Sequence, residues 1–244
     1  MNNLVIGLGE IGLPLMEVFR VRYKVWGKDK DTELSLPPID VIHICFPYDD
    51  KFADEVINYV EQYRPKLCII HSTVVPGTTD SIQVKVDTQV VYSPVRGRHG
   101  QMVADLRRYV KFIGGYDTSI ARELFKGAAL RVREFPSARA LELAKLIETT
   151  YSGLLIAWAQ EMKRYCGDIG IEYFSLMPFL AEIDYLPPVA FQPGHIGGHC
   201  IMANLDLLEQ VRASKFLDAI RESNQQVEPS TERLFPVPMT EFAS

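Results

Sequence analysis

The chain opens with Met1-Asn-Asn-Leu-Val-Ile-Gly-Leu-Gly-Glu-Ile-Gly-Leu-Pro-Leu15, in which a short apolar run leads into a spaced set of glycines. Leu4 to Ile6 has the composition of an interior parallel strand. Gly7, Gly9 and Gly12 follow in the pattern G-x-G-x-x-G. In this pattern the first glycine allows a tight turn, the second lets backbone approach a pyrophosphate, and the third lets the helix pack on the strand. The opening therefore predicts a strand, turn and helix that bind a dinucleotide over the helix N-terminus.

A second part of the dinucleotide pattern lies at Tyr23 to Asp29, which has the composition of the next strand. Asp29 ends it at about the spacing where an acid hydrogen-bonds the ribose hydroxyls of the adenosine. A carboxylate there repels a 2′-phosphate, so the residue favours NAD over NADP. Lys28 and Lys30 lie beside it and act in the opposite direction. The alternative is a glycine turn in some other α/β protein, which the combination of strand, helix and acid disfavours.

Composition limits the classes of function. The chain has 244 residues, of which 47% are hydrophobic and 23% charged, as in ordinary globular proteins with a substantial core. Its formal net charge of −5, without a basic stripe, disfavours a nucleic-acid partner. No apolar run reaches the length of a membrane span, and no signal peptide is expected. The four cysteines are scattered without C-x-x-C spacing, which favours a reducing compartment and a cytoplasmic protein.

Strand and helix patterns alternate through the first half of the chain. Alternation of this kind predicts a Rossmann-like, doubly wound, mostly parallel sheet, with ligands outside the carboxyl ends of its strands. The loops after residues 6, 46, 71 and 92 then belong to one crevice. The predicted strands after Asp29 cover residues 40–46, 66–71, 89–92, 111–115 and 130–134, and the predicted helices cover 54–63 and 119–127.

The pattern changes near Pro136, where a smaller all-helical domain is predicted to begin. Ser137 is a plausible N-cap of one helix that runs to about Gly167. Leu143, Ile147, Tyr151, Leu154 and Trp158 recur on it at spacings of three and four, and we interpret this stripe as core, buried by a second domain or another subunit. Further helical patterns cover 174–182 and 205–227. We expect domains at 1–136 and 137–227, and an extended tail at 228–244.

Four motifs now make the chain resemble a known family. They are Gly12-Leu-Pro, Ser72-Thr-Val-Val-Pro-Gly-Thr-Thr79, Glu142-Leu-Ala-Lys-Leu-Ile-Glu148 and Pro193-Gly-His-Ile-Gly-Gly-His-Cys200. In this order they resemble the motifs of the UDP-glucose, UDP-N-acetylhexosamine and GDP-mannose 6-dehydrogenases. The resemblance extends to about Asn224. The family continues into a C-terminal domain that holds the nucleotide sugar, and we interpret this chain as a short form.

The resemblance implies a catalytic set. In the family a cysteine attacks the aldehyde made by the first hydride transfer, a second transfer gives a thioester, and water releases the acid. Cys200 matches that cysteine, and Lys145 matches the lysine that steadies developing oxyanions. Thr149 stands where the family has an asparagine, one turn after the lysine. The implied cofactor-binding residues are Gly7, Gly9, Glu10, Ile11, Gly12, Asp29, Pro47 and Thr73.

Three departures concern the second half-reaction. Asn204 stands where the family has an aspartate, four residues after the cysteine. Val95 replaces the glutamate associated with thioester hydrolysis, and Tyr48 follows Pro47 where the family has threonine. Together these changes predict a preserved scaffold with altered chemistry.

Other interpretations of these residues remain. Cys200 could be a small buried hydrophobe, and Lys145 could lie on an exposed flank of its helix. His195, His199 and Cys200 could be metal ligands, but three groups within six residues without a distant acid disfavour a metal site, and we expect none. Arg96, Arg98 and His99 either bind an anionic group of the substrate or form a solvated loop.

The sequence leaves two classes of function. The first is an NAD-dependent oxidoreductase that acts on a CH–OH group of a sugar nucleotide or similar anionic small molecule. The second is a catalytically degenerate or partner-completed NAD-binding module. In either case we expect a homodimer through the helix that begins at Ser137, with neither nucleic acid nor membrane as partner.

Overall fold

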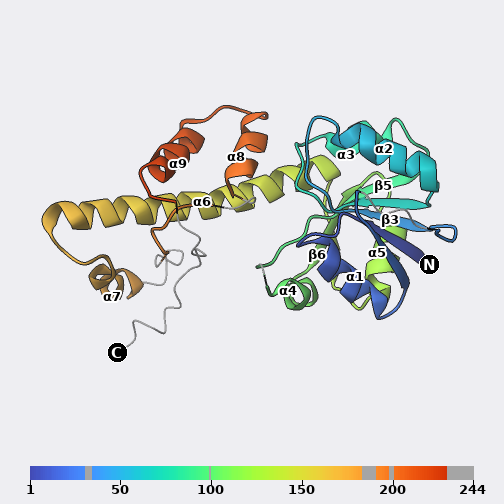
Figure 1. Cartoon of the computed structure of the whole chain (residues 1–244), viewed down its shortest axis with the longest axis horizontal. Coiled ribbons are helices and arrows are strands. Elements are labelled where there is room, and N and C mark those ends of the chain that lie inside the picture. Colours follow the sequence, from blue (N-terminus) through green and yellow to red (C-terminus); the bar gives the residue numbers. More distant parts are fainter. Residues whose placement is uncertain (31–34, 99, 183–190, 198–200, 230–244) are drawn as a thin grey trace. The chain divides into compact units, whose positions relative to one another are not determined.

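The computed structural model describes residues 1–30, 35–98, 100–182, 191–197 and 201–229 (Figure 1). The chain divides into two compact units, Met1–Lys145 and Leu146–Ser244, and helix α6 runs from the first into the second. The predicted domain boundary at residue 136 remains a prediction.

The first unit is built on a seven-stranded sheet in the order β2-β1-β3-β4-β5-β6-β7. All neighbouring strands are parallel except β5 and β6, which are antiparallel, so the predicted mostly parallel sheet is confirmed. The strands are β1 (Asn2–Ile6), β2 (Lys24–Lys28), β3 (Val41–Ile44), β4 (Leu67–Ile70), β5 (Gln89–Tyr92), β6 (Lys111–Gly115) and β7 (Val132–Glu134).

Helices cover both faces of the sheet, as a doubly wound fold requires (Figure 1). Phe52 and Val56 pack on one face, and Phe19 and Phe125 pack on the other. The first-unit helices are α1 (Gly12–Arg20), α2 (Phe52–Tyr63), α3 (Thr78–Gln83), α4 (Met102–Arg108) and α5 (Ser119–Gly127). Two of them, α3 and α4, lie largely in stretches for which the sequence analysis predicted no element.

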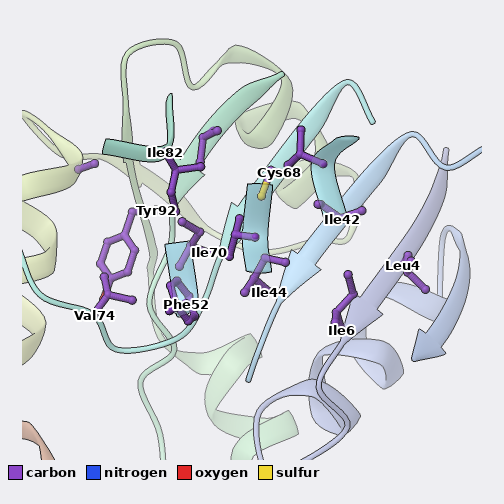
Figure 2. Packing of buried hydrophobic residues seen from close by; sticks show 14 of the residues in the cluster. Leu4, Ile6, Ile42, Ile44, Phe52, Cys68, Ile70, Val74, Ile82 and Tyr92 are labelled. Carbon is purple, nitrogen blue, oxygen red and sulfur yellow. The ribbon is translucent and has the colours of Figure 1, made fainter. Parts of the chain in front are cut away.

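The core under α2 and α3 is formed by aliphatic side chains from successive strands (Figure 2). Ile42, Ile44 and Ile70 are fully buried there beside Tyr92. Burial on both faces explains why these strands consist of almost continuous apolar runs, rather than alternating polar and apolar residues.

Adjacent parallel strands place their carboxyl ends at one edge of the sheet. Because β1, β3, β4 and β5 are neighbours in the sheet, the loops that follow residues 6, 46, 71 and 92 share that edge, as predicted.

The second unit is helical. It contains most of α6 (Ala138–Ile169), a 3-10 turn η1 (Tyr173–Leu176), α7 (Met177–Ala181), α8 (Ile201–Glu209) and α9 (Lys215–Gln225). The predicted N-cap of α6 is confirmed, because the Ala140 N–H donates to Ser137 Oγ at 3.1 Å. The predicted helical pattern over 205–227 is divided between α8 and α9, since Ser214 caps a new helix by accepting from Phe216 N.

The apolar stripe of α6 is not the core-facing side of this helix. Ile156, Ala159 and Met162 pack inward against α9 and the segment near Phe191. Ile147, Tyr151, Leu154 and Trp158 are exposed in the single chain, so the interpretation of this stripe as core of the same chain is wrong. Burial by another subunit remains the other part of that prediction.

Candidate cofactor site and catalytic residues

The glycine turn after β1 has the geometry that its sequence pattern requires. Gly7 has a φ of +92°, which strains any residue with a side chain, and a Cβ there would lie 2.8 Å from Phe46 N. Its own N–H donates to Lys28 O at 2.9 Å and so ties the turn to the end of β2. The first glycine therefore allows both the turn and the close approach of the β3 end.

The other two glycines also differ in a way that fits a dinucleotide. A Cβ on Gly12 would lie 1.9 Å from Gly7 O, so α1 packs directly on the turn. A Cβ on Gly9 would meet nothing within 4 Å, which leaves space over the backbone at that position. Ile11 occupies the N-cap of α1 without a side-chain oxygen to occupy the first N–H groups. The residues present therefore fit a pyrophosphate at this turn.

A pocket of about 590 Å³ lies beside the turn. It brings together three of the predicted cofactor residues, Gly7, Asp29 and Pro47, from the ends of β1, β2 and β3. The other lining residues are Ile6, Lys30, Phe46, Asp49, Glu55, Asn58, Tyr59 and Gln62. Its position and polar rim suit the adenosine part of a dinucleotide.

The remaining predicted cofactor residues lie outside that lining. Gly9 and Glu10 are exposed in the turn, Gly12 starts α1, and Thr73 follows β4 by three residues. These positions are suited to the phosphates and to the far half of a dinucleotide, rather than to adenosine.

The sequence analysis did not predict the residues that form one wall of the pocket. Glu55, Asn58, Tyr59 and Gln62 all project from α2 into the lining. Their spacing is i, i+3, i+4 and i+7, so they form one polar face of the helix. The periodicity can be seen in the sequence, but only the structure shows that this face of α2 lines the same pocket as Asp29.

Glu142 fixes the hydroxyl-rich loop after β4. Its carboxylate accepts from Gly77 N at 2.6 Å, Thr79 N at 2.9 Å and Thr79 Oγ1 at 2.6 Å. Burial raises the pKa of this carboxyl against the effect of those three donors. Two motifs that the sequence singled out separately are therefore joined, and α6 holds the loop that contains Thr73.

The predicted catalytic residues are only partly described by the structure. Cys200 lies outside the described residues. Lys145 is half-buried on α6 in the first unit, and the pKa of Lys111 is lowered mainly by burial and further by the Lys145 charge. Two other cysteines, Cys45 and Cys68, have thiols whose pKa is raised by burial, which opposes a nucleophilic role for either.

Thr149 and Asn204 meet in the second unit. Asn204 Nδ2 donates to Thr149 Oγ1 at 3.1 Å, and the threonine hydroxyl donates to Leu146 O at 3.0 Å. The single hydroxyl proton of Thr149 therefore goes to its own helix in this arrangement. Asn204 is buried, so its neutral amide is part of the packed interior of the second unit.

The loop after β5 contains Val95, another position at which the chain differs from the family that it resembles. Val95 is buried in the core that faces α4 and α5, and it offers no polar group. The Arg96 guanidinium lies 5.8 Å from the ring centre of Tyr109 and 5.9 Å from that of Phe112. Arg98 is anchored through its backbone, which donates to Asp105 Oδ2 at 2.8 Å, and His99 lies outside the described residues.

Within the part of the chain that the structure describes, no helix combines the length and hydropathy needed to span a bilayer. Among the described residues no three His, Cys, Asp or Glu side chains gather as metal ligands. Two residues of the metal alternative, His199 and Cys200, fall outside that part.

Residues 139–226 match the central domain of the UDP-glucose/GDP-mannose dehydrogenase family. UDP-N-acetyl-D-mannosamine dehydrogenase of Methanocaldococcus jannaschii is 27% identical, over 91% of this chain and 65% of its own length. The enzyme of that name from Escherichia coli K12 is 30% identical, over 61% of this chain and 34% of its own. The chain therefore spans less than two thirds of these curated relatives.

Solved structures share the fold. UDP-D-ManNAc dehydrogenase from Pyrococcus horikoshii superimposes with a TM-score of 0.81 at 22% identity, over 93% of this chain and 68% of its own. Mycobacterium tuberculosis 3-hydroxyisobutyrate dehydrogenase gives a TM-score of 0.72 at 15% identity, over 92% of this chain and 93% of its own. The superposition therefore covers nearly the whole of the Mycobacterium tuberculosis protein.

Proposed function

We propose that this chain is a nucleotide-sugar dehydrogenase, an NAD-dependent oxidoreductase that acts on a CH–OH group of a sugar nucleotide. One observation carries the proposal: Gly7 of the glycine turn and Asp29 line one pocket at the carboxyl ends of β1 and β2. The names of the relatives supply the substrate class.

NAD is favoured over NADP by the charges at the pocket. Asp29, Asp49 and Glu55 all line it, and among its described lining residues Lys30 is the one cation. A 2′-phosphate would add about two negative charges beside these carboxylates. The ribose hydroxyls of NAD can instead donate to Asp29.

Replacing Asp29 by alanine should weaken NAD binding by about 1 to 3 kcal/mol, the scale of a lost hydrogen bond to a charged group. Titration calorimetry measures it directly. Asp54→Ala is the matched control, because Asp54 is an exposed residue of α2 that does not line the pocket. NADP binding as tight as NAD, or binding of neither, would contradict the assignment of the pocket.

The predicted catalytic residues would act on the substrate as follows. Bound NAD would supply a hydride acceptor. Lys145 would stabilise the oxyanion that develops on the substrate, and Cys200 would add to the aldehyde carbon. The function is tested by incubating the purified chain with NAD and a panel of UDP- and GDP-sugars, while NADH absorbance is followed.

A catalytically degenerate or partner-completed NAD-binding module is the second candidate. Two observations favour it: Val95 is packed into the core, and the Thr149 proton is donated to Leu146 O. Under this alternative the chain binds NAD in calorimetry but forms no NADH with any of the sugar nucleotides.

A homodimer through α6 belongs to the same proposal. Exposed apolar side chains follow one face of the helix at positions 147, 151, 154, 158, 165 and 169. Such a stripe along a long helix marks an interaction site.

We expect sedimentation to show a dimer at micromolar concentration, and Trp158→Glu to shift it toward monomer. Phe179→Glu is the control, because Phe179 is also an exposed aromatic residue but lies on α7. A wild-type monomer would refute the dimer, and an equal loss of dimer in both variants would refute the placement of its interface.

A further inference from the structure

The loop between β4 and α3, residues 72–79, is tied to α6 by a buried carboxylate. Glu142 is fully buried, and its Oε2 accepts from Gly77 N at 2.6 Å. Its Oε1 accepts from Thr79 N at 2.9 Å and from Thr79 Oγ1 at 2.6 Å. Hydrogen bonds to a charged acceptor are stronger than those to a neutral one. Glu142 therefore holds the end of this loop against α6 within the first unit.

The local sequence cannot cap α3 by itself. The N-cap of α3 is Gly77, which has no side-chain acceptor, and its φ of +101° disfavours any residue that has one. The first N–H groups of a helix need an acceptor, and here none comes from the preceding turn. Glu142 supplies that acceptor from a position 63 residues beyond Thr79 in the chain. The start of α3 therefore depends on this one side chain of α6.

The beginning of the same loop is tied to the cofactor pocket. Ser72 Oγ donates to Phe46 O at 2.6 Å, and Phe46 lines that pocket. Val74 is fully buried in the core under α2 and α3. Thr73 is half-buried between these two points. The place of Thr73 is therefore set by Ser72 on one side and, through the rest of the loop, by Glu142 on the other.

The order of the strands puts Thr73 on the opposite side of the glycine turn from Asp29. In the sheet β2, which ends at Asp29, is followed by β1 with Gly7 and then by β3 and β4. A dinucleotide lies across the carboxyl ends of such strands. With adenosine beside Asp29 and the pyrophosphate at Gly7, the nicotinamide half extends toward the ends of β3 and β4. Thr73 follows β4 at that end.

We propose that Glu142 is a positioning residue that fixes residues 72–79 and thereby holds Thr73 at the nicotinamide half of NAD. The inference rests on the proposed function, in which the pocket beside Asp29 takes the adenosine. Glu142 touches neither cofactor nor substrate in this role, because its carboxylate is buried and bonded to the loop.

Glu142→Gln is the sharpest test, because it keeps the size of the side chain. Glutamine has a single acceptor oxygen, so its NH2 group must face the N–H of either Gly77 or Thr79, and that donor loses its partner. Asp80→Asn is the matched control. Asp80 lies 3.4 Å from Arg139, so this variant removes an exposed carboxylate that also links α3 to α6. Exposed pairs of this kind contribute little.

The first readout is amide hydrogen exchange of the protein without ligand. We expect residues 72–83 to exchange about 10- to 100-fold faster in Glu142→Gln than in the wild type, the scale of a lost bond to a charged group. Peptides from β1, β3 and β4 should keep the wild-type rate, and Asp80→Asn should keep it throughout. A wild-type rate for residues 72–83 in Glu142→Gln would overturn the proposal.

The second readout compares NAD with ADP by titration calorimetry. ADP has the adenosine and the two phosphates but lacks the nicotinamide riboside. In Glu142→Gln the Kd of NAD should rise about 10-fold, because NAD must then order the loop as it binds, while the Kd of ADP stays at the wild-type value. Asp80→Asn should change neither. An unchanged Kd for NAD, or equal losses for NAD and ADP, would overturn the proposal.

Faster exchange in the strands as well would report unfolding of the first unit, and Thr79→Val would then decide. Valine keeps the shape of threonine and both backbone bonds to Glu142 while removing the hydroxyl bond. We expect faster exchange of residues 72–83 and weaker NAD binding in this variant, and wild-type values for both would overturn the proposal. NAD binding without NADH formation in the wild type would overturn the proposed oxidoreductase and leave both comparisons intact.

Discussion

Acidification from pH 7 to pH 5 should lower the free energy of unfolding of the first unit by about 2 kcal/mol through His43 alone. Complete burial lowers the pKa of His43 to about 3, and the nearby Lys111 charge acts in the same direction. A neighbouring histidine, His71, is also fully buried with a lowered pKa, for the same two reasons. Its contribution has the same sign and adds to that of His43.

These side chains form a polar line across the sheet. His43 Nδ1 lies 3.0 Å from His71 Nε2, and His43 Nε2 lies 3.0 Å from Asn3 Oδ1. His71 Nδ1 lies 2.7 Å from Ser93 O, a carbonyl that also accepts from Lys111 Nζ at 2.8 Å. The line therefore connects β1, β3 and β6 with the ends of β4 and β5, on the face covered by α1 and α5.

The sign of the effect follows from which state binds the proton. Between pH 6.5 and about 3 the unfolded chain protonates His43 while the folded chain does not, so stability is present above pH 6.5 and is lost as the pH falls through this window. Lys111 acts at higher pH. Burial lowers its pKa from 10.5 to about 7, so stability rises with pH between those two values.

His43→Gln should reduce the slope of unfolding free energy against pH, between pH 5 and 6.5, by about 1 kcal/mol per unit on average. Urea unfolding followed by Trp26 fluorescence measures this for the first unit in a Trp158→Phe background, since the chain has only these two tryptophans. His195→Gln, in the second unit, is the matched control variant. Parallel curves for His43→Gln and wild type would show that His43 titrates normally in the folded state.

Local pattern was enough to predict most of the sheet. The apolar runs around Leu4, Ile42 and Ile69 became β1, β3 and β4 because buried parallel strands need no alternation. The break between α8 and α9 was not predicted, because Val211 to Ser214 contains neither glycine nor proline. Its only local signal is Ser214, a residue type that caps helices but also occurs within them.

The features that could not be predicted from the sequence depend on contacts between residues that are far apart in the chain. His43 and His71 are 28 residues apart, and Asn224 and Ile196 are also 28 residues apart, so only the folded chain brings each pair together. Helical periodicity grouped Tyr151 and Trp158 on one face correctly, but it carries no information about which face has a partner. The role of Cys200 came from a motif, and it remains a prediction.

The last expected result concerns the product: oxidation to a carboxylate should be absent or very slow, even where some NADH forms. After Cys200 becomes a thioester, release of the acid requires water to add to the thioester carbon and the thiolate to leave. Water must first lose a proton to a base. Val95 is buried among apolar side chains, and Asn204 donates its amide to Thr149, so neither position supplies one.

Loss of a general base costs about 10²- to 10⁴-fold in rate, or roughly 3 to 5 kcal/mol of barrier. Asn204→Asp should recover part of this factor, because a carboxylate at that position could accept a proton from water. Val95→Glu should not, since it would bury a charge in the core that faces α4 and α5. Uronic acid and NADH are measured together for several sugar nucleotides. If the wild type makes catalytic amounts of acid, at two NADH per sugar, a base outside these two positions must activate the water.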